Sequence, residues 1–145
     1  MTNSKRLGFT LIEVLIVVVI LAVLAATVIP QFTDSTDDAK ASSVKFNLHT
    51  LRSQIQLYRA QHEGELPSGT LAELLIKTNA DGTSTGSPEL GPYLSKLPVN
   101  SFTNKSDVKT ISSDPVVGDV SDDHGWLYNT NNGNIYISHE DMLDE

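Results

Sequence analysis

The sequence contains no cysteine, so its fold cannot rest on disulfide bonds. It is also poor in basic residues, with 10 Lys and Arg against 18 Asp and Glu and a formal net charge of −8. Lys5 and Arg6 contribute two positive charges and Glu13 one negative charge, so this total leaves −9 for the rest of the chain. Such acidity argues against a general nucleic-acid-binding surface, which needs clustered Lys and Arg, and against docking on anionic lipid. We expect no nucleic acid among the partners.

Common catalytic motifs are missing as well: there is no nucleophile elbow, no phosphate-binding glycine loop and no pair of metal-binding histidines. The histidines are scattered without metal-ligand spacing, and we interpret each as a surface or partly packed residue: His49, His62, His124 and His139. We therefore expect no enzyme activity. A chain of 145 residues is long enough for one small domain plus an anchor, not for two sizeable cores.

One stretch, residues 9–29, is almost wholly apolar, and its only polar side chains are Thr10, Glu13 and Thr27. As a helix it would span roughly 31 Å at about 1.5 Å per residue, which matches the hydrocarbon core of a bilayer. A helix that is apolar all round belongs in a membrane or among other helices. The basic residues of 5–6 precede it and none follows until Lys40, so the positive-inside rule predicts a cytoplasmic N-terminus and an exported C-terminal part.

Glu13 is the exception within this stretch, because an ionised carboxylate in an apolar setting costs several kcal/mol unless it is paired. Cleavage between Gly8 and Phe9 would create an ammonium group at Phe9, one helical turn away. In a packed assembly of helices, Glu13 of one subunit would neutralise the Phe9 ammonium of its neighbour and set the axial register between them.

Residues 5–13 read Lys-Arg-Leu-Gly-Phe-Thr-Leu-Ile-Glu and, with the apolar run that follows, resemble the N-terminal segment of type IV pilins and type II secretion pseudopilins. The resemblance runs to about Phe32, and Pro30 falls where these proteins commonly carry a proline. It implies cleavage after Gly8 by a prepilin peptidase, methylation of the Phe9 amine, and Glu13 as the carboxylate that acts in assembly.

Two plainer interpretations compete. The first is a secretory signal peptide with a weak cleavage site at Val23 and Ala25, but the run is longer than the usual core of about 7–15 residues. The second is a static single-span anchor, in which Glu13 reaches toward the membrane face or stays protonated. Neither accounts for the Gly-Phe-Thr-Leu-Ile-Glu segment as a unit.

After the apolar run, Pro30 predicts a kink or local loosening, and residues 34–38 are polar and poorly helical. This region is either a hinge in one helix or a break between two. A helical apolar stripe then repeats at spacings of 4, 3, 4, 3 and 4, and we interpret it as the core-facing surface: Val44, Leu48, Leu51, Ile55, Tyr58 and His62.

The remainder predicts a small head. Thr70 and Glu73 have the spacing of a capping box at the start of a short helix, and residues 79–88 form a loop. A Gly-Pro-Tyr-Leu segment at 91–94, followed by Pro98, again resembles pseudopilins. Strands are expected at 108–111, 125–128 and 134–138, the last two joined by a hairpin turn with an Asn-Gly pair. Alternate residues of these two strands would cover the helix stripe.

An acidic loop precedes Trp126 and holds Asp114, Asp119, Asp122 and Asp123. Oxygen ligands in a flexible loop suit calcium, and the resemblance implies it too, because major pseudopilins often bind calcium in a C-terminal loop. The spacing matches no EF-hand, however, and residues 98–102 replace the Asp-Pro-Trp-Gly stretch that is usual in the family. A solvated acidic loop is the favoured interpretation.

These features together predict an α+β, pilin-like fold in which a long N-terminal helix packs against a small antiparallel sheet. The expected divisions are a leader at 1–8, a transmembrane and assembly helix at 9–29, an amphipathic continuation at 30–63 and a head at 64–145. We expect a homo-oligomeric filament subunit of a type II secretion pseudopilus, served by prepilin peptidase and the assembly machinery of the bacterial inner membrane, with lipid around the helix before assembly. The alternatives are a type IV pilus subunit and a membrane-tethered module that never polymerises.

Overall fold

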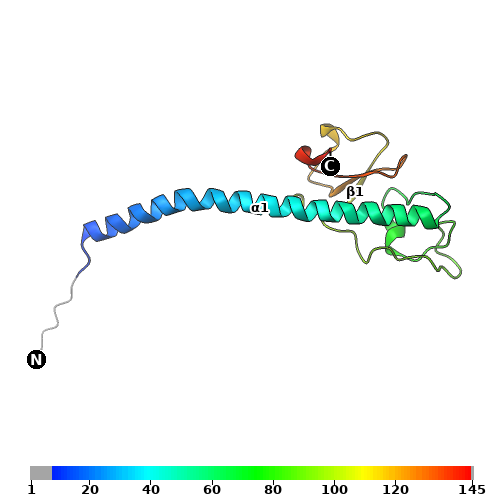
Figure 1. The fold of residues 1–145 in the computed structure, drawn as a ribbon, viewed down its shortest axis with the longest axis horizontal. Coiled ribbons are helices and arrows are strands. Elements are labelled where there is room, and N and C mark those ends of the chain that lie inside the picture. Colours follow the sequence, from blue (N-terminus) through cyan, green and yellow to red (C-terminus); the bar gives the residue numbers. More distant parts are fainter. Residues whose placement is uncertain (1–7, 145) are drawn as a thin grey trace, which may run out of the picture. The chain divides into compact units, whose positions relative to one another are not determined.

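The computed structural model describes residues 8–144, and within them the side chains of all residues except 29–34. The basic residues 5–6 thus lie outside the described part. A long helix is followed by short 3-10 helices and three strands (Figure 1). In chain order the elements are α1 (Leu11–Gln61), η1 (Ala72–Leu75), β1 (Val108–Ile111), η2 (Val117–Asp119), β2 (Trp126–Asn129), β3 (Ile135–Ile137) and η3 (Glu140–Met142). This layout confirms the predicted α+β, pilin-like fold class.

The chain divides into two compact units, Met1–Ala39 and Lys40–Glu145, and the second contains the head. The backbone of α1 is helical from Leu11 to Gln61 and so continues past Pro30 as one element rather than two separate helices. The kink expected at Pro30 stays a prediction, because its side chain is outside the described set.

The core of the second unit is built on one face of α1. The predicted stripe is buried in full, and none of its members is more than 3% exposed: Val44, Leu48, Leu51, Ile55, Tyr58 and His62. Burial of an aliphatic side chain of this size contributes about 1.5–3 kcal/mol. The stripe therefore supplies much of the apolar surface against which the head folds.

His62, the last member of the predicted core-facing stripe, lies inside the core. It is fully buried, its ring stacks on Tyr58 at a centroid distance of 3.6 Å, and its Nε2 lies 2.8 Å from Oγ1 of Thr78. Its Nδ1 lies 2.8 Å from the backbone carbonyl of Tyr58. The interpretation of His62 as a surface or partly packed residue is wrong, because both ring nitrogens find partners inside the core and burial then leaves no polar atom unsatisfied.

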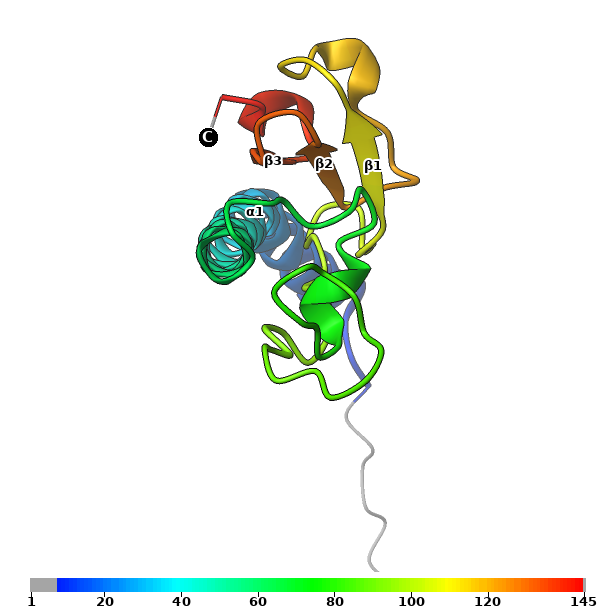
Figure 2. The same ribbon diagram turned by 90° about the vertical axis from the view of Figure 1, so that its right-hand side faces the viewer.

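The sheet has the strand order β1-β2-β3 and packs over α1 (Figure 2). The predicted hairpin is present, since β2 and β3 are antiparallel with Trp126 opposite Ile137 and Tyr128 opposite Ile135. The sheet is mixed, however, and not wholly antiparallel, because β1 runs parallel to β2. Residues 112–125 make this possible: a long connection can carry the chain back to the start of the sheet, which a tight turn cannot do.

Strand β2 is buried on both of its faces. Trp126 and Tyr128 pack on the stripe of α1, as the alternation predicted, and Leu127 is also 0% exposed although it points to the other face. Two polar atoms in this strand are satisfied by backbone carbonyls: Trp126 Nε1 donates to Pro98 at 2.8 Å, and the Tyr128 hydroxyl donates to Pro67 at 3.1 Å. On the second face, Leu127 lies between its cross-strand neighbours Lys109 of β1 and Tyr136 of β3.

The short helix forms at η1, but its capping box does not. Leu71 takes the N-cap position with φ 57 and no side-chain cap. Glu73 Oε2 instead accepts hydrogen bonds from the amide and hydroxyl of Ser68, at 3.2 and 2.5 Å. Leu71 and Leu74 are fully buried. Burial of Leu71 in the core therefore determines the backbone conformation at this position, and the predicted capping box does not form.

Candidate functional site

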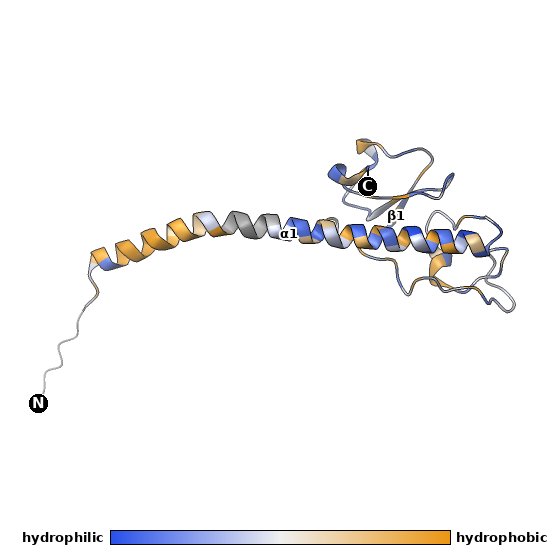
Figure 3. Cartoon of the chain, in the orientation of Figure 1, coloured by the Kyte–Doolittle hydropathy of each residue, from blue (hydrophilic) through white to orange (hydrophobic). Residues whose placement is uncertain are grey.

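The N-terminal part of α1 is an apolar surface that its own subunit does not cover. Leu11–Val28 is long and apolar enough to cross a membrane, with a mean hydropathy of 3.1, and none of it is buried. Figure 3 shows hydrophobic residues along the whole of this part of the helix, whereas hydrophobic and hydrophilic residues alternate along the C-terminal part of α1. A surface of this kind needs lipid or other helices as its surroundings.

Glu13 lies in the first turn of α1 and is held by Thr10. The amide and the hydroxyl of Thr10 donate to Glu13 Oε2 at 2.7 and 2.6 Å, and the Glu13 amide donates back to the Thr10 hydroxyl oxygen at 3.3 Å. This reciprocal pattern is a capping box, with Thr10 as the N-cap. The sequence carries the signal for this cap in the Thr-x-x-Glu spacing of residues 10–13, which the interpretation of Glu13 as an isolated carboxylate overlooked.

The cap leaves Glu13 with capacity for a further partner. Both bonds from Thr10 go to Oε2, and among the described residues the structure records no bond to Oε1. A carboxylate at a helix N-terminus is also stabilised by the helix dipole. The carboxylate is therefore partly satisfied within its own chain and still able to accept from a cation.

Gly8 and Phe9 lie just before α1 and are openly accessible. Phe9 is 84% exposed. A Cβ atom placed on Gly8 would meet no atom within 4 Å, so the fold does not itself require glycine at this position. The peptide bond between them is placed where an enzyme could reach it.

Three carboxylates of the acidic loop accept hydrogen bonds from separate partners. The Tyr136 hydroxyl donates to Asp114 at 3.1 Å, and the Lys109 ammonium donates to Asp119 at 3.2 Å. The Ser121 hydroxyl donates to Asp123 at 3.2 Å. Among residues 8–144, no group of three or more His, Asp or Glu side chains is placed to hold a metal ion. Calcium binding by the four aspartates therefore stays a prediction.

Asp119 has a structural role in this loop. It accepts a hydrogen bond from the Val116 amide at 3.1 Å and pairs with Lys109. The Val116 amide, followed by Lys109, lowers the pKa of the Asp119 carboxyl below its usual value. The carboxylate therefore fixes the loop that follows β1.

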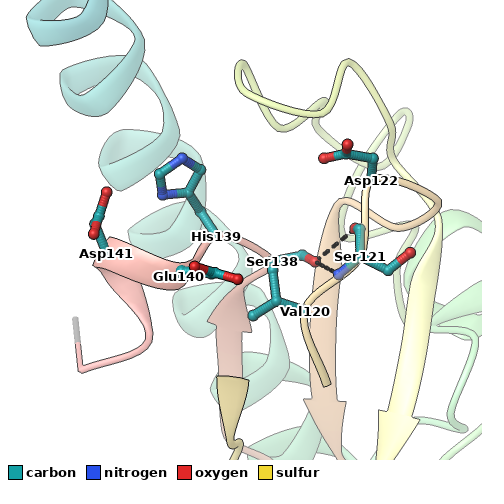
Figure 4. Close-up of a pocket in the computed structure, with 7 residues that line it drawn as sticks. All are labelled: Val120, Ser121, Asp122, Ser138, His139, Glu140 and Asp141. Atoms are coloured by element: carbon teal, nitrogen blue, oxygen red, sulfur yellow. Dashed lines mark hydrogen bonds between the residues drawn. The ribbon is translucent and has the colours of Figure 1, made fainter. Parts of the chain in front are cut away.

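A hollow of about 370 Å³ lies beside the fourth aspartate, Asp122. Figure 4 shows Asp122 apart from Glu140 and Asp141, which come from η3 at the other end of the hollow. Between them, Ser138 Oγ donates to the Ser121 carbonyl at 3.0 Å and accepts from the Ser121 amide at 3.3 Å. These bonds join the two segments, so the hollow lies along the contact between them.

Residues 3–29 match the model of the prokaryotic N-terminal methylation motif. The type II secretion system core protein G of Pseudomonas aeruginosa is 32% identical over 104 residues, which cover 72% of this chain and 73% of that protein. The type IV narrow pilus major component PilA5 of Thermus thermophilus is 40% identical over 57 residues, covering 39% of this chain and 49% of that protein. A fimbrial protein of Neisseria meningitidis is 35% identical over 89 residues, 61% of this chain and 52% of its own length. No solved structure gives a significant match.

The apolar stretch Leu11–Val28 and the methylation motif together support membrane anchoring through the N-terminal helix. The chain belongs to the pilin-like family that includes the type II secretion pseudopilins and the type IV pilins. The confirmed resemblance supports a subunit of a pseudopilus or a pilus, and relatives of this kind are structural proteins rather than enzymes.

Proposed function

We propose that this chain is the structural subunit of a type II secretion pseudopilus, a helical filament that it builds through the N-terminal part of α1. It is made as a membrane-inserted precursor with its N-terminus in the cytoplasm and its head exported. A prepilin peptidase cuts it after Gly8 and the new Phe9 amine is methylated. The apolar helix then moves from lipid into the centre of the filament.

The observation that carries this proposal is the apolar surface of Leu11–Val28, which is long enough to span a bilayer and 0% buried in the subunit. Lipid and packed helices are similarly apolar, so the exchange of one for the other costs little and is driven by packing and polar pairing between helices. A helix that served only as a signal would not need a carboxylate at a defined place within it.

Glu13 gives the assembly its register. In the precursor, its Oε2 is held by Thr10 at the start of its own helix. After cleavage, the Phe9 ammonium of a neighbouring subunit pairs with the Glu13 carboxylate, so neither charge is left unpaired in the apolar centre of the filament. The capping box keeps the carboxylate in place for this contact.

The first experiment is an intact-mass measurement, with N-terminal fragment sequencing, of the protein from its native membrane fraction. A chain that starts at Phe9 and is heavier by one methyl group supports the proposal. A chain that retains residues 1–8 indicates a static anchor, and one that starts near Ala26 indicates an ordinary secreted protein.

Two substitutions of Glu13 separate its charge from its role as a cap. Glu13→Leu removes both, whereas Glu13→Gln keeps a side-chain oxygen that can accept from Thr10. Both variants should insert into the membrane, because neither reduces the apolar length of the helix. Neither should form filaments if charge pairing drives assembly; normal filaments from both variants would refute the pairing.

Gly8→Val tests the processing step. Because nothing in the fold contacts the Gly8 position, this change should leave the head intact and act only on recognition by the peptidase. The expected product is an uncut, correctly inserted precursor that forms no filament. Cleavage at the normal rate would contradict processing at this bond.

A type IV pilus subunit is the second candidate, and the identity to the pilus component PilA5 and to the fimbrial protein favours it. Both matches cover only about half of the relative's length, whereas the match to core protein G covers 73%. Deletion of the gene distinguishes the two: loss of protein secretion indicates a pseudopilus, and loss of surface pili with secretion intact indicates a pilus.

A further inference from the structure

A cation from the sheet lies within the acidic loop. Lys109 of β1 extends its ammonium to Asp119, where it donates to the backbone carbonyl at 2.9 Å and to carboxylate Oδ1 at 3.2 Å. The two side chains are partly buried, with 32% and 26% of their surface exposed. Hydrogen bonds between charged groups are stronger than those between neutral groups. The ammonium therefore joins the middle of the loop to the sheet by two bonds to one residue.

The section of the loop that receives this ammonium folds around the same carboxylate. Asp119 Oδ2 accepts from the Val116 amide at 3.1 Å, and the Asp119 amide donates to the Val116 carbonyl at 2.8 Å. The Val120 amide donates to the Val117 carbonyl at 3.1 Å. Figure 2 shows this section, which contains η2, beyond the end of β1. The carboxylate of Asp119 thus connects the internal bonds of the section to the ammonium from β1.

Neutral donors hold the loop before and after this section. Asn131 Nδ2 donates to the Ser112 carbonyl at 2.8 Å, directly after β1. On the far side of η2, the Ser121 amide donates to Ser138 Oγ at 3.3 Å. These bonds fix the two ends, and Lys109 fixes the section between them. Loss of the ammonium should therefore loosen the middle of the loop and leave its ends in place.

The two oxygens that Lys109 contacts are of the kinds that calcium uses. Calcium binds carboxylate and backbone carbonyl oxygens at about 2.3–2.6 Å, so an ion on either oxygen of Asp119 would lie within about 5 Å of the ammonium. Two positive charges so close repel each other. Among residues 8–144, moreover, no group of three or more His, Asp or Glu side chains is placed to hold a metal ion. The ammonium and a calcium ion therefore compete for the same oxygens.

We propose that the Lys109 ammonium is the built-in cation of this loop and takes the place of a divalent ion. It is attached to the chain, so the loop keeps its positive charge at every calcium concentration and the fold of the head is independent of calcium. The alternative is a calcium site made by the four aspartates. The proposal concerns the head alone and holds whether or not the chain builds filaments, so its failure is distinguishable from failure of the proposed function.

The response of the wild-type chain to calcium is the first test. Thermal unfolding of the full-length chain in detergent micelles is followed by the emission of Trp126, the only tryptophan, which is fully buried. One sample contains calcium chloride, and the other contains EGTA and magnesium chloride at the same concentration of divalent ions. We expect the same midpoint in both samples. A higher midpoint in calcium overturns the proposal.

The second test removes the ammonium. Lys109→Met keeps an apolar stem of similar length beside Leu127, its neighbour across the sheet. Hydrogen exchange of the Val116 and Val120 amides should become about five- to tenfold faster, as expected when the bonds of one partly exposed charge are lost. Lys109→Arg keeps a cation with several donors, and its exchange should stay within about twofold of the wild type. Wild-type exchange in Lys109→Met, or no rescue by Lys109→Arg, overturns the proposal.

Lys105→Met is the matched control. It makes the same change of charge at an exposed lysine of the head, shortly before β1. The amides of Val116 and Val120 should exchange at the wild-type rate in this variant. Equal acceleration in Lys105→Met and Lys109→Met would show that the net charge of the head controls the loop, rather than the bonds of Lys109 to Asp119, and would overturn the proposal.

Discussion

Ionisation of the Tyr128 hydroxyl lowers the stability of the head at alkaline pH. Tyr128 is 0% exposed and its hydroxyl donates to the Pro67 carbonyl at 3.1 Å. Burial, followed by the nearby charges of Glu73 and Tyr58, raises the pKa of Tyr128 from 10.0 to about 12. The folded head therefore keeps the phenol protonated at a pH where the unfolded chain has already released the proton.

This difference has a calculable size. A rise in pKa from 10.0 to about 12 corresponds to about 2.7 kcal/mol of folding free energy. The contribution is fully present below about pH 10 and is lost as the pH rises through about 12. Tyr128→Phe removes the titrating group and leaves the Pro67 carbonyl without its donor, at a cost of about 1 kcal/mol. The variant should thus be less stable than the wild type at neutral pH and more stable near pH 12.

Urea unfolding of the full-length chain in detergent micelles measures this crossover. Trp126 is the only tryptophan in the sequence and is fully buried, so its emission maximum reports unfolding of the head. Tyr136→Phe is the matched control: Tyr136 is only partly buried, and a smaller dependence on pH is expected. A gap between wild type and Tyr128→Phe that stays constant from about pH 9 to about pH 12 would show that ionisation of Tyr128 does not control stability in this range.

Three further predictions, which use four substitutions, can be tested in the same assay. Leu51→Ala removes a fully buried side chain from the stripe on α1 and should cost about 2–5 kcal/mol; a loss below about 1 kcal/mol contradicts its place in the core. Gly125→Ala would bring a Cβ within 2.2 Å of a backbone carbonyl and should unfold the head, while Gly118→Ala, with open space around it, should be tolerated. The hydrogen bond from the Val116 amide lowers the pKa of Asp119 in the folded head. The stability that the Asp119 carboxylate contributes should therefore be lost as the pH falls through this lowered pKa, and Asp119→Asn should remove this acid dependence.

The two capping patterns show where sequence reasoning succeeds and where it fails. Residues 10–13 and 70–73 carry the same Thr-x-x-Glu spacing, yet only the first forms a capping box. At the start of α1 nothing else in the subunit competes for the backbone. At η1 the full burial of Leu71 competes, and the gain of about 1.5–3 kcal/mol from burying a leucine offsets the cost of about 1–2 kcal/mol for its left-handed backbone.

The helix stripe and the hairpin could be predicted because each is a local property. A 4-3 spacing marks one face of a helix, and an Asn-Gly turn with alternating apolar residues marks a hairpin, whatever lies around them. The direction of β1 could not be predicted, because parallel and antiparallel pairing are both open to a strand after a long connection. The burial of Leu127 on the second face of β2 and the pairing of His62 with Thr78 likewise depend on partners distant in the sequence.

The sequence alone determined the character of the N-terminal segment, because the length of an apolar run and the place of a charge within it do not depend on folding. It also determined the core-facing side of α1 and the two strands of the hairpin. Only the tertiary structure decided that Asp114 accepts from Tyr136, that Asp119 pairs with Lys109, and that Leu127 is buried on the second face of β2. These are relations in space between side chains, and the sequence order of residues far apart in the chain does not specify them.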